Sequence, residues 1–398
     1  MRAGALLEGL AAIGDVYLLV VPVFDPGRND LSEAARQHCT EYRIVKITPA
    51  DRLAGNVTTF LSSYRQQSSP LPVLNSQRLQ HAAEAGFKEI PFDYVYVFRL
   101  YMAQLMTSRL SGNTVQGRFL DIDDIESVTR NRLAALYRKN GLIKKARQEE
   151  KAAKQFEVFE RQQLPMFDSV AVCSHGDRAR IRDKLPENTI HVLPNVIRCR
   201  ENAQLAGSSD IFNMLFVGNL NYYPNQDALA FFIDEILPLL REQTTRRLNF
   251  TIVGSGKWPG IAARQHVKEC DFVGYVADVA PYYQQADAVV VPLRAGGGTR
   301  IKILEAFSFR KPVVTTSSGI EGISAEDEAQ VLIADQPARF AAQICRIMED
   351  LPLAERLTTR AHKMLIENYT IDVLKHRLAN MIKSTLERSD ISSTDSKH

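Results

Sequence analysis

A run of glycines followed by two cations and a carboxylate is the part of this sequence best suited to chemistry. The glycines are Gly296, Gly297 and Gly298. A glycine loop leaves backbone N–H groups uncovered, and a helix that begins after it adds partial positive charge, so the turn is suited to bind phosphate. Arg300 and Lys302 bring two cations to this turn, and an arginine can hold phosphate oxygens with two parallel hydrogen bonds.

Glu305 adds a carboxylate to the same helix face, three residues after Lys302. One turn away from a phosphate, it is well placed to accept hydrogen bonds from sugar hydroxyls. A plainer alternative stays open, in which the segment is a glycine turn followed by a surface Lys302–Glu305 pair, because glycine loops are weak motifs.

The elements around the glycine loop are those of a βαβ unit. Two short apolar runs, Ala288–Leu293 and Pro312–Thr316, have the pattern of buried parallel strands. Between them, Thr299 is placed to cap a helix that runs from about Arg300 to Phe309. Further strands are predicted at Leu215–Val217, Leu248–Val253, Asp271–Tyr275 and Val331–Ala334. Gly218 suits a tight strand-to-helix turn near a phosphate.

These segments together resemble the donor-site signature of family-4 glycosyltransferases, which are retaining enzymes of the GT-B fold. The resemblance rests on residues 296–306 (Gly-Gly-Gly-Thr-Arg-Ile-Lys-Ile-Leu-Glu-Ala), 312–316 and 319–322, and on 215–228, 250–254 and 272–279. It covers 211–350 strongly and the first half of the chain loosely. It implies an α/β protein of two Rossmann-like doubly wound domains with an inter-domain cleft.

The resemblance also implies roles for residues. Arg300 and Lys302 would stabilise the leaving diphosphate, and Glu305 would hold donor hydroxyls, most of all those of the ribose. Val273, Gly274 and Tyr275 would flank the nucleobase. The implied donor-binding set is Gly218, Asn219, Gly254, Val273, Gly274, Tyr275, Gly296, Gly297, Gly298 and Thr299. No metal ion and no cofactor besides the nucleotide diphosphate sugar is expected.

The sequence departs from the family pattern at two positions. Many relatives have a basic residue after the glycine of the first turn, where this chain has Asn219. Many also have a second glutamate eight positions before Glu305, where this chain has Gly297, so sugar contacts there would come from backbone N–H groups.

The first half of the chain alternates predicted strands and helices, which indicates a doubly wound domain. Its strands are predicted at Val16–Val21, Tyr42–Ile47, Tyr94–Phe98, Phe119–Ile122, Ser169–Ser174 and His191–Pro194, after a helix at Leu6–Ile13. Ligands of such sheets lie beyond the carboxyl ends of the strands. Arg99 and Tyr101 follow one of these ends and are candidates to hold an acceptor, unless they are ordinary loop residues.

Asp123 and Asp124 follow another strand end. Asp121-x-Asp123 has the spacing of a carboxylate pair that holds a divalent ion on a nucleotide diphosphate, and helix capping or acceptor binding is the alternative that we favour. Some relatives have a catalytic histidine near this point, and its role cannot be transferred to Asp123.

We expect five segments: an acceptor-side domain (1–197), a linker (198–212), a donor domain (213–370), a helix crossing back to the first domain (371–387) and a polar, disordered tail (388–398). The first helix and second strand of the usual first domain are recognisable. Its first, central strand is not, and we therefore expect the chain to lack it.

Bulk composition limits the class of protein. The chain has 398 residues, a net charge of +3 and five scattered cysteines, which suggests two domains and no structural zinc or disulfide framework. No apolar run reaches the ~18 residues of a membrane span. The basic stretch 138–154, expected within one long helix over 138–162, is either a solvated face or a face that rests on anionic lipid. We expect a cytoplasmic protein, with a peripheral place at the inner face of the membrane as a further expectation, and no nucleic acid as partner.

The expected function is the transfer of a hexose-type sugar from a nucleotide diphosphate donor to a glycan or lipid-linked acceptor with retention, as in exopolysaccharide synthesis. Two alternatives remain: a catalytically silent nucleotide-sugar-binding subunit of a polysaccharide assembly system, and a GT-B nucleotide-sugar epimerase. Donor hydrolysis without acceptor, or its absence despite tight binding, separates an enzyme from a silent subunit.

Overall fold

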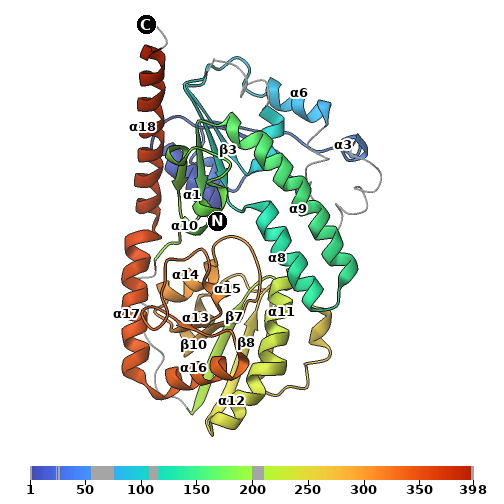
Figure 1. The fold of residues 1–398 in the computed structure, drawn as a ribbon, viewed down its shortest axis with the longest axis vertical. Helices are drawn as coiled ribbons and strands as arrows, with labels where there is room; N and C mark the ends of the chain where they lie inside the picture. The colour runs from blue at the N-terminus through green and yellow to red at the C-terminus, as the bar shows by residue number, and fades with distance from the viewer. Residues whose placement is uncertain are drawn as a thin grey trace. The chain divides into compact units, whose positions relative to one another are not determined.

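The computed structural model describes residues 2–23, 25, 27–54, 76–106, 115–199 and 210–395. The chain folds into two compact units. Unit 1 consists of Met1–Ser127, Lys151–Pro194 and Ile371–His398, and unit 2 of Val128–Glu150 and Asn195–Thr370. Figure 1 shows their elements.

Unit 2 is built on a parallel sheet with the strand order β12-β11-β10-β7-β8-β9. The first strand along the chain, β7, is therefore central, and the strand order reverses between β7 and β10, as in a doubly wound α/β sheet. The strands are β7 (Ile211–Val217), β8 (Arg247–Val253), β9 (Cys270–Gly274), β10 (Ala288–Val291), β11 (Val313–Thr315) and β12 (Leu332–Ile333). All the predicted strands of this half are confirmed, with ends that differ by one to four residues.

The core of unit 2 explains why these short runs form strands. Every residue of β10 and β11 is buried, and most are β-branched, which suits a sheet covered on both faces. The helices are α11 (Tyr223–Phe231), α12 (Leu237–Gln243), α13 (Ala280–Gln285), α14 (Ile301–Ser308), α15 (Ser317–Ile320), α16 (Pro337–Glu349) and α17 (Leu351–Asn368). The π-helical η4 (Phe232–Ile236) joins α11 to α12, and η5 (Pro259–Ile261) is a short 3-10 turn.

Unit 1 contains two separate parallel sheets. One pairs β1 (Tyr17–Val20) with β2 (Glu41–Ile44), and the other has the order β3-β4-β5-β6. The second sheet consists of β3 (Tyr94–Phe98), β4 (Gly117–Ile122), β5 (Ser169–Val172) and β6 (Ile190–Val192). Among the described residues, β1 pairs only with β2, and β3 only with β4. The expectation of a missing central strand stays a prediction.

The helices of unit 1 cover these sheets. They are α1 (Arg2–Ala11), α2 (Glu33–Arg36), α3 (Pro49–Ala54), α6 (Gln77–Ala85), α10 (His175–Ile181) and α18 (Ile371–Asp395), with 3-10 turns η1 (Leu100–Met106), η2 (Leu164–Met166) and η3 (Glu187–Thr189). Helix α18, dark red in Figure 1, packs beside α1, and a Cβ added to Gly9 would lie 3.0 Å from Leu378 Cδ2. Residues 388–395, expected to be part of a disordered tail, continue this helix.

A hairpin of two helices, α8 (Glu126–Lys139) and α9 (Ile143–Gln163), replaces the single helix expected over 138–162. Gly141 has a φ of 74°, a backbone conformation that glycine adopts without strain and that ends α8. Residues 128–150 of this hairpin belong to unit 2, although the sequence boundaries assign them to the first domain. The residues 200–209 of the expected linker lie outside the described residues.

No helix in the described part of the chain is both long enough and apolar enough to cross a membrane.

Candidate active site

Three glycine turns meet at the carboxyl end of the unit 2 sheet. The backbone N–H of Gly254, after β8, donates to Gly274 O at 2.8 Å, at the end of β9. A Cβ added to Gly254 would lie 1.7 Å from Gly218 O, so only glycine fits there. A Cβ on Gly218, after β7, would lie 2.9 Å from Lys302 Nζ. The sequence-predicted Gly218, Gly254, Gly274 and Lys302 are therefore neighbours, at the end of the sheet where doubly wound folds bind ligands.

Lys302 is the cation at the centre of this group. Its Nζ donates to Asn225 Oδ1 at 2.9 Å and lies 4.1 Å from the centre of the Phe216 ring. Among the described residues, no carboxylate oxygen lies within 4.0 Å of Lys302 Nζ, so this nitrogen forms no ion pair with them. Burial, and then the nearby Arg300, lower the pKa of Lys302 to about 7, because both disfavour its charged form.

Asn225 is fixed in turn by the first glycine turn. Its Nδ2 donates to Asn219 O at 2.9 Å, and the Asn219 side chain accepts from Asn221 N at 2.9 Å. Asn219 thus shapes the backbone next to Gly218, and its own side chain is turned to that backbone.

Arg300 is buried, with 6% of its surface exposed, and braces the glycine loop. Its Nη1 donates to the carbonyl oxygens of Gly297 and Gly298, and its Nη2 donates to Ser318 O at 3.2 Å. Gly296 and Gly298 have φ values of 145° and 63°, so the loop needs glycine at both positions. The sequence analysis assigned the Arg300 guanidinium to phosphate binding. In this structure it is hydrogen-bonded to the carbonyl groups of the glycine loop instead.

Thr299 does not cap helix α14. The helix begins at Ile301 with Arg300 at the N-cap position and no side-chain cap bond. Thr299 Oγ1 is buried and has no hydrogen-bond partner among the described residues. The predicted cap is wrong because the chain enters the helix one residue later than the threonine requires.

Glu305 lies one turn after Lys302 and is held by a tyrosine. The hydroxyl of the fully buried Tyr283 donates to Glu305 Oε2 at 2.9 Å and lies 3.1 Å from Lys302 O. Burial, and then the neighbouring Glu305, raise the pKa of Tyr283 well above its usual range. This tyrosine fixes the direction of the carboxylate, and the sequence reasoning did not identify it.

The three residues expected at the nucleobase lie at the end of β9. Val273 is half-buried, Gly274 has a φ of 83°, and Tyr275 is 77% exposed. The carbonyl oxygen of Gly274 accepts a hydrogen bond from the backbone N–H of Gly254, and Tyr275 is exposed to solvent.

The acceptor-side candidates of unit 1 form a charged cluster at the ends of β3 and β4. Arg99 Nη2 donates to Asp123 Oδ2 at 2.6 Å, and Arg99 has a left-handed φ of 72°, which is strained for arginine. The pKa of Arg99 is raised, since Tyr101, Asp123 and Asp124 outweigh the opposing effect of burial. Tyr101 is buried, and this burial raises the pKa of its hydroxyl.

Asp121 and Asp123 are each engaged by an arginine. Arg2 holds the fully buried Asp121 with two hydrogen bonds, at 2.8 and 2.6 Å, and Asp123 binds Arg99. Burial raises the pKa of Asp121, although Arg2 opposes the shift. In the described part of the chain, no three His, Cys, Asp or Glu side chains are grouped so that they could hold a metal ion.

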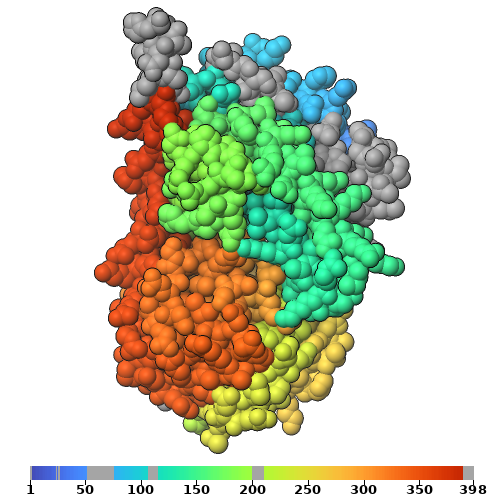
Figure 2. Space-filling view, viewed as in Figure 1, coloured from blue at the N-terminus to red at the C-terminus, as the bar shows by residue number. Residues whose placement is uncertain are grey.

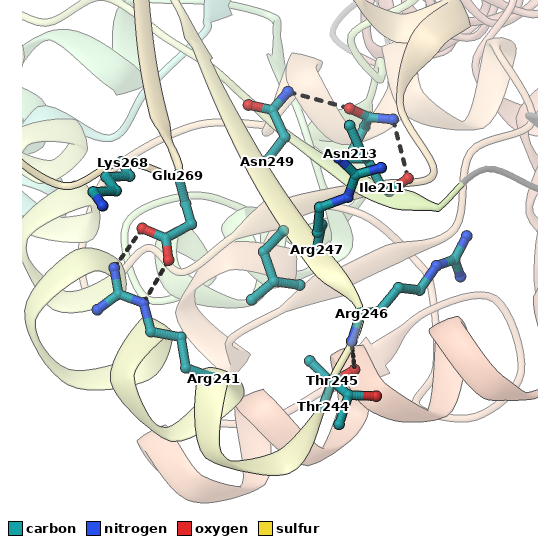
Figure 3. Close-up of a pocket in the computed structure, with 11 residues that line it drawn as sticks. Ile211, Asn213, Arg241, Thr244, Thr245, Arg246, Arg247, Asn249, Lys268 and Glu269 are labelled. Carbon is teal, nitrogen blue, oxygen red and sulfur yellow. Dashed lines mark hydrogen bonds and ion pairs between the residues drawn. The ribbon is translucent and has the colours of Figure 1, made fainter.

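A hollow of about 580 Å³ lies at the opposite end of the unit 2 sheet, near the amino ends of β7 and β8. Figure 3 shows its basic side chains and the two hydrogen bonds by which Arg241 binds Glu269, at 2.8 and 2.5 Å. It is larger than the hollow beside the glycine loop, but none of the predicted site residues lines it.

Four residues of unit 2 extend the predicted set: Asn225, Tyr283, Arg132 and Arg294. Arg132, on α8, donates to Gly296 O at 3.2 Å and to Glu321, and Arg294 binds Asp227 with two hydrogen bonds. Asn225 lies within a segment that the sequence had singled out. Arg294 lies between the predicted strand Ala288–Leu293 and the glycine loop but was not identified. Arg132 and Tyr283 come from other segments, and no local pattern marks them.

Comparison with known proteins agrees with this geometry. Residues 211–350 match the family model described as Glycosyl transferases group 1. A curated relative is an uncharacterised 44.6 kDa protein in the cps region of Klebsiella pneumoniae, 25% identical over 166 residues. That match covers 39% of this chain, and it spans 42% of the relative's length.

Solved structures resemble nearly the whole chain. Sucrose-phosphate synthase from Thermosynechococcus elongatus has a TM-score of 0.69 at 16% identity, with 96% of this chain and 92% of that chain covered. Anabaena Alr3699/HepE, in complex with UDP and glucose, has a TM-score of 0.59 at 13% identity, with 92% and 99% covered. The chain therefore has the GT-B fold, and the predicted fold class, two Rossmann-like α/β domains, is confirmed.

Proposed function

We propose that the protein is a glycosyltransferase that moves a sugar from a nucleotide diphosphate to a glycan or lipid-linked acceptor. One observation carries this proposal: Lys302 stands among the glycine turns that end β7, β8 and β9, one turn before Glu305, within the segment that matches the glycosyltransferase family model. A partly buried cation among glycine turns suits a diphosphate, and the carboxylate suits hydroxyls.

The chemistry of these residues is mainly electrostatic. As the sugar leaves, negative charge grows on the diphosphate, and groups already fixed in place stabilise that charge without reorganising. Lys302 is the direct cationic contact that we propose, and Arg300 supports it by holding the carbonyl groups of Gly297 and Gly298 away from the phosphate. A direct Arg300–phosphate contact requires the guanidinium to leave those carbonyls.

Glu305 is proposed to accept hydrogen bonds from donor hydroxyls, in an orientation set by Tyr283. The transferred group is proposed to be a hexose, and the reaction to retain configuration at the anomeric carbon, with the leaving phosphate helping to deprotonate the acceptor. Uridine diphosphate sugars are the first donors to test, because UDP accompanies a structure of the same fold.

We propose that no metal ion is needed. The cationic charge of Lys302 and the backbone N–H groups would take the place of a divalent ion at the diphosphate, and Asp121 and Asp123 of unit 1 are each bound by an arginine. Activity should therefore persist in EDTA. Loss of activity in EDTA and recovery with Mn²⁺ would contradict this part of the proposal.

A peripheral place at the inner face of the membrane is proposed for the basic face of α9. The helix buries Ala146, Ala153 and Phe156 and exposes Lys144, Lys145, Arg147, Lys151 and Lys154. Its side chains, green in Figure 2, lie open on the face drawn there. Such a face suits anionic lipid and an enzyme that glycosylates lipid-linked acceptors in exopolysaccharide synthesis.

The test is a thermal-shift screen of nucleoside diphosphate sugars, since a ligand that binds only the folded state raises its melting temperature. The donor that binds is then followed by nucleoside diphosphate release with and without glycan acceptors, and by NMR of the product's anomeric configuration. A donor that binds, is hydrolysed and yields a retained product supports the proposal. If no nucleotide diphosphate sugar shifts the melting temperature, the proposal is wrong.

A silent nucleotide-sugar-binding subunit is the second candidate. Two observations favour it: Gly297 stands where many relatives have a glutamate, and Arg300 is turned into the glycine loop. Tight binding without hydrolysis or transfer would favour this candidate over the enzyme.

A further inference from the structure

A cavity of about 430 Å³ lies beside the glycine loop, within the range of small-ligand sites, and neither Lys302 nor Glu305, the proposed donor contacts, lines it. One wall is a stripe of helix α8 at helical spacing, formed by Arg132, Ala135, Leu136 and Lys139. The facing wall follows the carboxyl ends of β10 and β11 and includes Arg294, Gly296, Ser318 and Glu321. All of these residues belong to unit 2.

The wall formed by α8 is attached to the rest of unit 2 by specific contacts. Arg132 donates to Gly296 O at 3.2 Å and binds Glu321 across the cavity. At the end of the helix, Asn140 Nδ2 donates to Asp227 Oδ1 at 2.6 Å and to Tyr223 Oη at 2.8 Å. The rings of Tyr137 and Tyr223 stack with centroids 4.3 Å apart. The cavity is therefore a built part of unit 2.

Positive charge predominates on the lining of this cavity. Three of the lining residues, Arg132, Lys139 and Arg294, are cationic, and Glu321 is the one carboxylate among them. Glu321 is neutralised by Arg132, and Asp227 neutralises Arg294 from outside the lining. Lys139 is exposed and has no carboxylate of the described residues within 4.0 Å, so its charge is open to a ligand. Ser318 adds a polar group, while Ala135 and Leu136 give an apolar side to the cavity.

We propose that this cavity binds the oxyanion of an acidic acceptor sugar, a carboxylate or a phosphate, with Lys139 as its main cation. The inference rests on the proposed function, because Lys302 is assigned to the donor diphosphate and a second cationic site next to the glycine loop is then left for the other substrate. A charged, partly apolar cavity that contacts Gly296 would hold an acidic pyranose beside the donor and would select it over a neutral sugar.

The experiment measures sugar binding with the donor phosphate site already filled by saturating nucleoside diphosphate. Glucose, glucuronate and glucose 6-phosphate are compared by calorimetry or ligand-observed NMR on the full chain. Comparison of the affinities for glucuronate and glucose 6-phosphate shows whether the cavity prefers a carboxylate or a phosphate. We expect one of them to bind about tenfold more tightly than glucose, as one charged hydrogen bond supplies.

Lys139→Gln should remove this preference, and Lys139→Glu should reverse it. Lys144→Gln and Lys144→Glu are the matched controls, because Lys144 is exposed, belongs to unit 2 and does not line the cavity. Both controls should retain the preference. Equal affinities for the three sugars, no binding of either acidic sugar at roughly 10 mM concentrations, or equal loss in the Lys144 variants would overturn the proposal.

The outcome also separates this inference from the proposed function. If a nucleoside diphosphate binds and the acidic sugars show no preference, only the inference about the cavity is wrong. If no nucleoside diphosphate binds, the donor site itself is misassigned, and the sugar arms still decide whether the cavity selects an oxyanion.

Discussion

The charge of Lys302 depends on what lies next to it. Its hydrogen-bond partner is the neutral amide of Asn225, and no carboxylate of the described residues lies within ion-pair distance of its ammonium group, although the nearby Glu305 favours the charged form. Its pKa is lowered to about 7, chiefly by burial. A bound diphosphate would supply the missing negative charge and favour the protonated form.

We therefore predict that nucleoside diphosphate binding takes up a proton. At pH 7 the uptake should be roughly half a proton, it should approach one at higher pH and vanish well below pH 7. Calorimetry in two buffers with different ionisation enthalpies measures it. Lys302→Arg should bind without uptake, and Asn225→Asp should abolish uptake by giving the lysine a permanent partner. Uptake that is unchanged in both variants would assign the proton to another group.

The same shift has a consequence for stability. The unfolded chain has the usual lysine pKa of 10.5 and binds more protons than the folded chain between about pH 7 and 10.5. The contribution of Lys302 to the free energy of unfolding therefore rises with pH across this window. Lys302→Met should flatten this part of the pH profile, as urea denaturation can measure.

Glu305 and Tyr283 allow a second prediction at this scale. If Glu305 holds the ribose, Glu305→Gln should weaken nucleoside and nucleoside diphosphate binding alike. Tyr283→Phe should do the same more weakly, since the carboxylate loses its orienting hydrogen bond, at a structural cost of about 0.5–1.5 kcal/mol. Competition binding with the two ligands measures both effects. A loss confined to the diphosphate would contradict the ribose role.

The sequence predicted which residues lie at the carboxyl end of the unit 2 sheet. It predicted the orientations of their side chains less well. Glycine positions, Lys302 and Glu305 follow from local spacing. The partners Asn225 and Tyr283 lie 77 and 22 residues from Lys302 and Glu305, and periodicity does not contain such contacts. The inward turn of Arg300 and the missing Thr299 cap depend on the exact backbone path of the glycine loop.

At the scale of elements, the α8–α9 hairpin is the feature that local reasoning described least well. The basic, helical composition of 138–162 was recognised, but not the break at Gly141 or the attachment of 128–150 to unit 2. That attachment depends on Asn140, Tyr137 and Arg132, whose partners lie in α11 and in the glycine loop.

Asn140→Ala should loosen the hairpin tip. Two hydrogen bonds are lost, one of them to the buried Asp227. We expect the free energy of unfolding, measured by urea denaturation, to fall by about 1–2 kcal/mol. Lys144→Ala, on the exposed face of α9, should change stability little. Equal stability of the Asn140 variant and the unaltered protein would show that the tip contacts do not persist in solution.

The membrane proposal is tested on α9 itself. Replacing Lys144, Arg147 and Lys151 by Glu should abolish binding to vesicles containing anionic lipid, and binding of the unaltered protein should fall with salt. In a control variant with the same change in charge, Arg356, Arg360 and Lys363 on the exposed face of α17 are replaced by Glu. If both triple variants co-sediment equally with vesicles, α9 has no special role.

At the scale of the whole molecule, the alternation of strands and helices predicted doubly wound α/β domains, because apolar runs at regular intervals form parallel sheets. The GT-B arrangement was predicted from the resemblance to family-4 glycosyltransferases. The strand order of unit 2 matches the doubly wound expectation. The discontinuous composition of unit 1 could only partly be predicted, since the place of α18 in this unit depends on its packing against α1, more than 350 residues earlier in the chain.

Leu378→Ala in α18 should destabilise unit 1 selectively. The side chain is fully buried against Gly9 of α1, and its loss should cost about 2–5 kcal/mol. Hydrogen exchange should show the loss in unit 1, while nucleoside diphosphate binding to unit 2 stays unchanged. Lys383→Ala, on the exposed side of the same helix, is the control. Equal effects on both units would mean that they unfold together.

Helix α18 is made by the ribosome after all of unit 2, yet it belongs to unit 1. Residues 195–370 can collapse as they emerge, whereas the earlier segments 1–127 and 151–194 must wait with the face of α1 uncovered until residues 371–395 leave the exit tunnel. At about 5–20 residues per second, that interval lasts on the order of 10–50 seconds. The apolar face of α1 that α18 covers in the folded protein is therefore exposed on the nascent chain throughout this interval.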